Sequence, residues 1–161
     1  MDANLCRDHL KNVLVEENGL LAKLETLLDQ EHAHIVANDV DALDRTGRTR
    51  QACMGDLVRL EGERQSLCRM SGRAANREGL EQLLRWCDPA GTLIDHWKEC
   101  AERATRCRQL NDRNGLIVAA RIKRVEGMLN IISGNTQAPV TYGRQGAYAA
   151  SAPGRMIRGE A

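Results

Sequence analysis

The chain has 161 residues, of which 28% are charged and 42% hydrophobic, a composition typical of a soluble globular or helical protein. It has no phenylalanine and only two Trp and two Tyr, which argues against a β-sandwich or a doubly wound sheet, because such folds usually need more aromatic and β-branched residues. A net charge of +1 gives no general reason to expect nucleic-acid binding. The sequence has neither an 18-residue apolar run nor a signal-peptide-like start, so we expect a cytoplasmic protein without membrane insertion.

The first part of the sequence predicts one long helix. Apolar residues recur from Leu10 to Val36 at alternating spacings of three and four residues, which forms one stripe on a helix of roughly 30 residues. Asn38 and Asp39 then supply a stop and a new N-cap, so a second helix should follow directly.

The second helix should end at the Ser71-Gly72 break, and its apolar stripe is poorer. Gly47 and Arg50 occupy positions where apolar residues should fall. The residues that we expect to face inward are Val40, Leu43, Met54, Leu57, Leu60 and Leu67.

A short helix and a last long helix complete the prediction. Asn76 can cap a short helix that runs to Trp86, and the Asp88-Pro89-Ala90-Gly91 stretch ends it. The last helix begins near Thr92 and closes at Ser133-Gly134-Asn135. Its expected inward residues in the first half are Leu93, Trp97, Ala101 and Ala104.

The second half of that helix carries an apolar seam with an average spacing of 3.5 residues, as in a coiled coil: Val118, Ile122, Val125, Leu129 and Ile132. An amphipathic partner helix could lie along this seam, but the seam could equally pack on the first helix or on a second copy of the chain. Asn111 and Asn114 precede it on one face, where they either bond to a neighbouring helix or are exposed.

Residues 134–161 differ from the rest of the chain. They contain five Gly, two Pro, six Ala and no Leu, without a sustained period. Such a segment buries too little apolar area to offset its ordering entropy. We therefore expect an all-α fold of long antiparallel helices in a coiled-coil-like bundle over residues 1–133, followed by a flexible tail with a partner-binding motif.

Charge is divided along the chain. Residues 1–44 hold ten acidic and three basic residues, whereas residues 45–132 hold eleven acidic and seventeen basic residues. Antiparallel helices could use this division to fix their pairing, and solvated faces of mixed sign explain it equally well.

Residues with catalytic or metal-binding potential do not form a recognisable site. The six cysteines contain no C-x-x-C pair, so we expect reduced thiols that pack as small hydrophobic residues. Glu31 and His34 form a single Glu-x-x-His pair, while a di-metal bundle needs two such pairs and two further Glu. We therefore expect no catalytic residues, no metal and no cofactor.

Two short motifs near the end of the chain carry a family resemblance. Residues 110–117 read L-N-D-R-N-G-L-I, and residues 141–146 read T-Y-G-R-Q-G after about twenty helical residues. This arrangement resembles the FlgN family of flagellar type III export chaperones, and the leucine-rich first helix and the break at residues 38–43 agree in layout. Arg50 stands where the family would have a lysine near the middle of the second helix, which keeps the charge.

The resemblance implies a non-enzymatic chaperone with several flagellar partners. It would bind the C-terminal helical segment of hook-associated proteins at the hook–filament junction, prevent their premature polymerisation and deliver them to the export gate and its ATPase complex. Asn111, Asn114 and Gly115 fall on the family motif. The resemblance also assigns Tyr142 and Gly146 to contact with the export gate.

Two other classes of function remain open from the residues alone. One is a self-associating coiled-coil structural or adaptor protein, which would form a homodimer through the seam. The other, with the least support, is a helical enzyme with a di-metal or thiol-redox centre.

Overall fold

The computed structural model describes residues 2–133 of the chain. They form four helices and, within this range, no strand: α1 (Ala3–Ala37), α2 (Val40–Met70), α3 (Arg77–Cys87) and α4 (Ile94–Ile132). The prediction of an all-α fold is confirmed. The expected tail, with Tyr142 and Gly146, lies outside the described residues.

Two units are distinguished along the chain, residues 1–123 and residues 124–161. The first contains α1, α2, α3 and most of α4, and the second begins with the C-terminal end of α4. In the part of the chain that the structure describes, no helix combines the length and the apolar character needed to cross a membrane.

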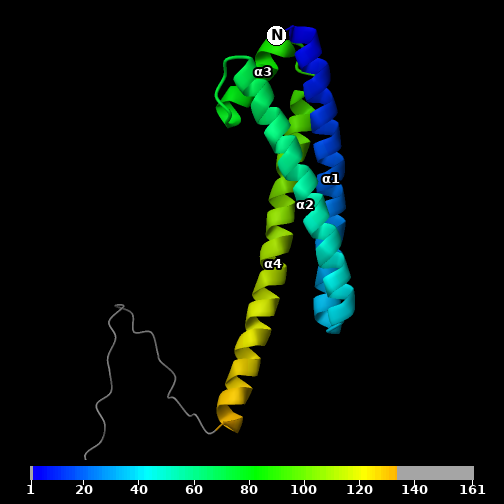
Figure 1. The fold of residues 1–161 in the computed structure, drawn as a ribbon, viewed down its shortest axis with the longest axis vertical. Helices are drawn as coiled ribbons and strands as arrows, with labels where there is room; N and C mark the ends of the chain where they lie inside the picture. The colour runs from blue at the N-terminus through cyan, green and yellow to red at the C-terminus, as the bar shows by residue number, and fades with distance from the viewer. Residues whose placement is uncertain (1, 134–161) are drawn as a thin grey trace, which may run out of the picture. The chain divides into compact units, whose positions relative to one another are not determined.

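Capping residues explain the sharp reversal between α1 and α2. Asn38 ends α1 in the left-handed conformation, with φ of 57°, which asparagine tolerates better than most residues. Asp39 then caps α2, because its carboxylate accepts a hydrogen bond of 2.9 Å from the backbone N–H of Ala42. The two helices therefore lie side by side and antiparallel, as Figure 1 shows.

The inward face of α2 differs from the predicted one. Val40 and Met54 are 68% and 41% exposed, so their prediction as inward residues is wrong. The face that packs against α1 uses mainly small side chains beside two leucines: Ala42, Thr46, Cys53, Leu60, Leu67 and Cys68. Because α1 is rich in leucine, it supplies most of the bulk of the core, and small residues on α2 fit against it.

The short helix α3 lies beside the end at which α1 begins (Figure 1). Asn76 caps it, as predicted, by accepting a hydrogen bond of 2.9 Å from Gly79 N. At its other end, the buried carboxylate of Asp88 accepts bonds from the Leu93 N–H (2.7 Å) and the Thr92 hydroxyl (2.9 Å). This carboxylate thereby holds the backbone in place where α4 begins.

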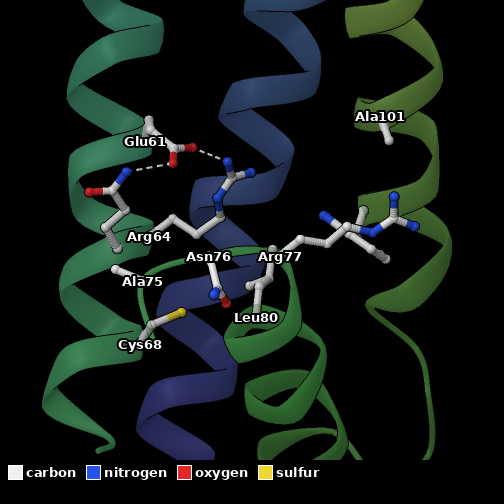
Figure 2. Close-up of a pocket in the computed structure, with 10 residues that line it drawn as sticks. Glu61, Arg64, Cys68, Ala75, Asn76, Arg77, Leu80 and Ala101 are labelled. Atoms are coloured by element: carbon white, nitrogen blue, oxygen red, sulfur yellow. Dashed lines mark hydrogen bonds and ion pairs between the residues drawn. The ribbon is translucent and has the colours of Figure 1, made fainter. Parts of the chain in front are cut away.

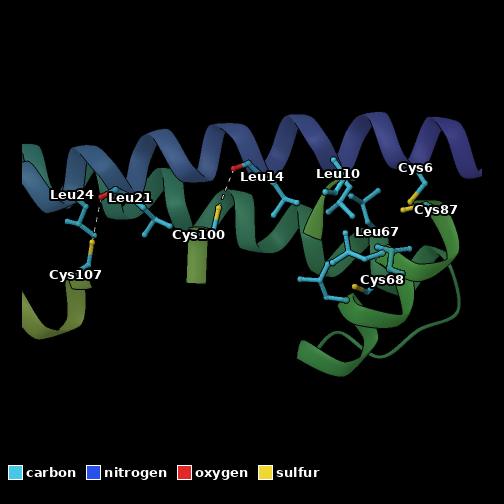
Figure 3. Close-up of a cluster of buried hydrophobic side chains, with 14 of the residues drawn as sticks. Cys6, Leu10, Leu14, Leu21, Leu24, Leu67, Cys68, Cys87, Cys100 and Cys107 are labelled. Carbon is cyan, nitrogen blue, oxygen red and sulfur yellow. Dashed lines mark hydrogen bonds between the residues drawn. The ribbon is translucent and has the colours of Figure 1, made fainter. Parts of the chain in front are cut away.

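Helix α4 packs on α1 through side chains that recur every seventh residue and donate to backbone carbonyls, and Figure 3 shows those of Cys100 and Cys107. The bonds are Cys100 Sγ to Leu14 O (3.4 Å), Cys107 Sγ to Leu21 O (3.6 Å) and Asn114 Nδ2 to Leu28 O (2.8 Å). Because the partners advance together along both helices, α4 runs parallel to α1 in one fixed register. Ala101 was predicted to face inward but is exposed, since the inward line runs through Cys100 and Cys107 instead.

The acidic first helix pairs with arginines of the later helices, which supports the interpretation that charge fixes the pairing. Five acidic residues of α1 take part: Glu16 with Arg59, Glu17 with Arg64, Glu25 with Arg103 and Arg106, Asp29 with Arg113, and Glu31 with Arg50. The exposed pairs contribute little stability individually. Together they disfavour any other alignment of the later helices along α1, because such an alignment would separate the arginines from these acidic residues.

All six cysteines are free and buried, as expected of thiols that pack as hydrophobic residues. The thiols of Cys6 and Cys87 lie together where α1 begins and α3 ends (Figure 3). Burial raises the pKa of Cys87 and Cys107 to about 11 and that of Cys100 to about 12.

These raised pKa values predict a loss of stability in alkaline solution. Above pH 9 the unfolded chain releases thiol protons that the folded chain retains, so the free energy of unfolding should fall as the pH rises from 9 to 11. Urea denaturation at a series of pH values would measure it. In the Cys100→Ala/Cys107→Ala variant the fall should be shallower, and an equally steep fall would contradict the assignment.

Candidate partner-binding groove

A groove of about 480 Å³ lies between α1, α2 and α4 within residues 1–123. Its walls are mainly apolar or lack side chains, and the residues that form them are Ile35, Leu43, Gly47, Gly115, Val118, Ala119 and Ile122. A smaller hollow of about 130 Å³ continues it over the α1–α2 turn, where Val40 and Arg121 join the lining.

Charged and amide side chains close one end of the groove and link three helices. Glu31 of α1 is only 5% exposed, and Arg50 of α2 approaches it with 3.0 Å between Nε and Oε1. The same guanidinium donates from Nη1 to Asn111 Oδ1 of α4 at 3.2 Å. A buried carboxylate requires such a partner, because desolvation otherwise penalises its charge.

Asn114 extends this polar cluster and bonds to a neighbouring helix. It is 5% exposed, donates to Leu28 O, and has its Oδ1 3.3 Å from Nδ1 of His32. Asn111 is exposed but still accepts a bond from Arg50, so both asparagines connect to other helices. Of the motif residues, Asn111, Asn114 and Gly115 all line the groove.

The apolar seam divides between the groove and the end of α4. Val118 and Ile122 line the groove, whereas Val125, Leu129 and Ile132 belong to the second unit. All five side chains are between 40% and 81% exposed. Val118 and Ile122 follow Asn114 on the α4 face that is directed toward α1, and they line the groove together with Ile35 of α1. They are nevertheless 40% and 54% exposed, so α1 leaves them largely uncovered.

Sequence reasoning did not assign Gly47, Leu43 and Ile35 to a binding site. The sequence did contain one indication of the groove: Gly47 and Arg50 stand in the second helix at positions where the apolar stripe predicts apolar residues. Gly47 and Arg50 both line the groove.

Figure 2 shows a second cavity, of about 250 Å³, that lies between α2, α3 and α4. Its charged groups are largely engaged: Arg64 pairs with Glu61 and Glu17, and Arg77 lies 5.4 Å from the ring centre of Trp97. Burial raises the pKa of Glu17, and Arg64 opposes this shift. This cavity is a less open candidate for a protein partner than the groove.

The chemistry of the described residues offers no metal centre. Within residues 2–133, no three His, Cys, Asp or Glu side chains converge as a metal ion requires. Glu31, which the sequence places in a Glu-x-x-His pair, directs its carboxylate to Arg50.

The Glu31–Arg50 pair gives a test of how the closed end is held. Arg50→Met should lower the free energy of unfolding by about 2 kcal/mol, because it leaves a buried carboxylate without its partner. The double variant Glu31→Met/Arg50→Met should recover most of this loss. Urea denaturation measures both values, and a double variant no more stable than the single one would contradict the pairing.

Comparisons with known proteins identify the family to which the chain belongs. Residues 1–150 match the sequence profile of the FlgN protein family. The flagella synthesis protein FlgN of Escherichia coli (strain K12) is 24% identical over 140 residues, which covers 85% of this chain and 88% of the relative. No solved structure gives a significant match. Because the family match extends over nearly the whole sequence, the chain belongs to the FlgN family.

Proposed function

We propose that this chain is a non-catalytic cytoplasmic chaperone of flagellar synthesis. It binds the C-terminal helical segment of hook-associated proteins, prevents premature polymerisation and delivers these proteins to the type III export gate and its ATPase complex. Family membership and the name of the Escherichia coli relative support the flagellar role. The observation that carries the proposal is the exposed apolar face of α4 from Val118 to Ile132.

This face has the length and the pattern that a partner helix needs. From Gly115 to Ile132 it extends along the α4 axis for about 25 Å, which matches a helix of about 17 residues. Its apolar residues recur at spacings of three and four, the pattern used when an amphipathic helix lies in a groove. A solvent-exposed apolar face of this extent marks an interaction surface.

A homodimer is the second candidate, because the same spacing is that of a coiled-coil seam. In that case the seam would be covered by a second copy of the chain, and the protein would act as a structural adaptor. Binding measurements with a partner segment distinguish the two.

Isothermal titration with the C-terminal segment of a hook-associated protein tests the proposal. We expect one-to-one binding with a negative heat-capacity change, since apolar surface is buried. Val125→Glu/Leu129→Glu should weaken binding by at least about tenfold without unfolding the chain, because both side chains are exposed. Val58→Glu, at an exposed apolar position on α2, is the matched control and should bind normally.

Two other results would contradict the chaperone. Absence of heat with folded wild-type protein, together with seam-dependent dimers in analytical ultracentrifugation, would support the adaptor. Unfolding of Val125→Glu/Leu129→Glu, detected by circular dichroism, would show that these residues stabilise the fold and do not form a free binding face.

The Tyr142→Ala variant tests the delivery to the export gate separately from the binding of the partner. Tyr142→Ala should leave the folding and the partner affinity unchanged while it lowers the secretion of hook-associated proteins, because we assign this residue and Gly146 to the export gate. Secretion into the culture medium and titration with the partner segment measure the two effects. A loss of partner affinity would assign the tyrosine to cargo binding instead.

A further inference from the structure

Two glycines on different helices leave a hollow in the groove. Gly47 of α2 and Gly115 of α4 both line it, and a Cβ added at either position would have no atom within 4 Å. Neither has a positive φ, so backbone conformation does not require glycine there. Each glycine is less favourable in a helix than alanine.

Gly47 differs from the other glycines in the interior of α2. Gly55 and Gly62 also have free space around a Cβ, but they are exposed and do not line the groove. Gly47 is half-buried although no neighbour would touch its Cβ, so the space beside it is walled by more distant atoms. A bulky apolar side chain of a docked helix fits such a space.

The stretch of α4 beside the groove is strongly basic. Residues 108–123 contain four basic residues and the single acidic residue Asp112. Arg113 pairs with Asp29, whereas Arg121 donates only to neutral oxygens, those of Asn38 and Val36. Among the described residues, the remaining two basic side chains of this stretch, Arg108 and Lys123, form no ion pair.

We propose that the groove binds an amphipathic helix with an acidic polar face, and that one bulky apolar side chain of this helix enters the hollow beside the half-buried Gly47. The inference rests on the proposed function and specifies the chemistry of its partner. The positive charge on α4 would attract the acidic face and disfavour basic helices. The hollow would select a large side chain at one position of the apolar face.

The test uses the full chain and three probes in the same titration assay. Two are synthetic amphipathic peptides of about 18 residues with identical leucine faces, one with Glu and one with Lys on the polar face. The third is the C-terminal segment of a hook-associated protein. The Glu peptide should bind at least about tenfold more tightly than the Lys peptide, and this preference should shrink at high salt.

Variants of the chain test the hollow and the charge. Gly47→Leu should weaken the binding of the Glu peptide by at least about tenfold while the melting temperature stays equal or rises, because leucine favours the helix. Gly55→Leu is the matched control and should leave binding unchanged. Lys123→Glu should reduce the preference for the Glu peptide, and Lys11→Glu, on the exposed N-terminal part of α1, should not.

The outcomes separate the inference from the proposed function. Equal binding of the Glu and Lys peptides, full affinity in folded Gly47→Leu, or no binding of either peptide would overturn the inference. If the hook-associated segment still binds to wild type in these cases, the proposed function stands. If the Glu peptide binds as expected and the hook-associated segment does not, the inference stands and the assigned cargo is wrong.

Discussion

The contacts that every seventh residue of α4 makes with backbone carbonyls of α1 set the orientation of α4, and the position of the groove depends on that orientation. Cys100, Cys107 and Asn114 point toward α1, and this fixes the rotation of α4 about its own axis. The residues that follow on this face, Val118 and Ile122, are consequently directed into the groove. Apolar side chains at the three donor positions would pack without the same directional demand, so the polar donors specify orientation more than they add stability.

The polar cluster around Glu31, Arg50 and Asn114 marks the boundary between two environments. On one side, leucines and cysteines of the helices form a closed core. On the other side, apolar residues of α4 are exposed and line an open groove. The cluster allows one continuous helix to serve both, because its hydrogen bonds hold the helices together at the point where apolar packing ends. Family membership and this division together direct attention to the open part as the place where a partner binds.

The sequence predicted the helices and their caps well, because these depend on local chemistry. Asn38, Asp39 and Asn76 act as capping residues by interactions within a few positions of the chain. The inward faces of α2 and α4 were harder to predict, since Cys53, Cys100 and Cys107 are small residues that a search for large apolar stripes undervalues. Periodicity identified Val118 and Ile122 as part of a binding face but not the rest of the groove, because its walls come from three helices and Gly47 contributes only the absence of a side chain.

The even spacing of the donors also limits how α4 can move. A shift of α4 along α1 by one, two or three residues would carry the donors away from their carbonyls together, because all of them repeat with the same period. The same shift would move Arg103 and Arg113 away from their partners on α1, Glu25 and Asp29. The backbone-carbonyl contacts and the ion pairs therefore select the same single register of α4 on α1.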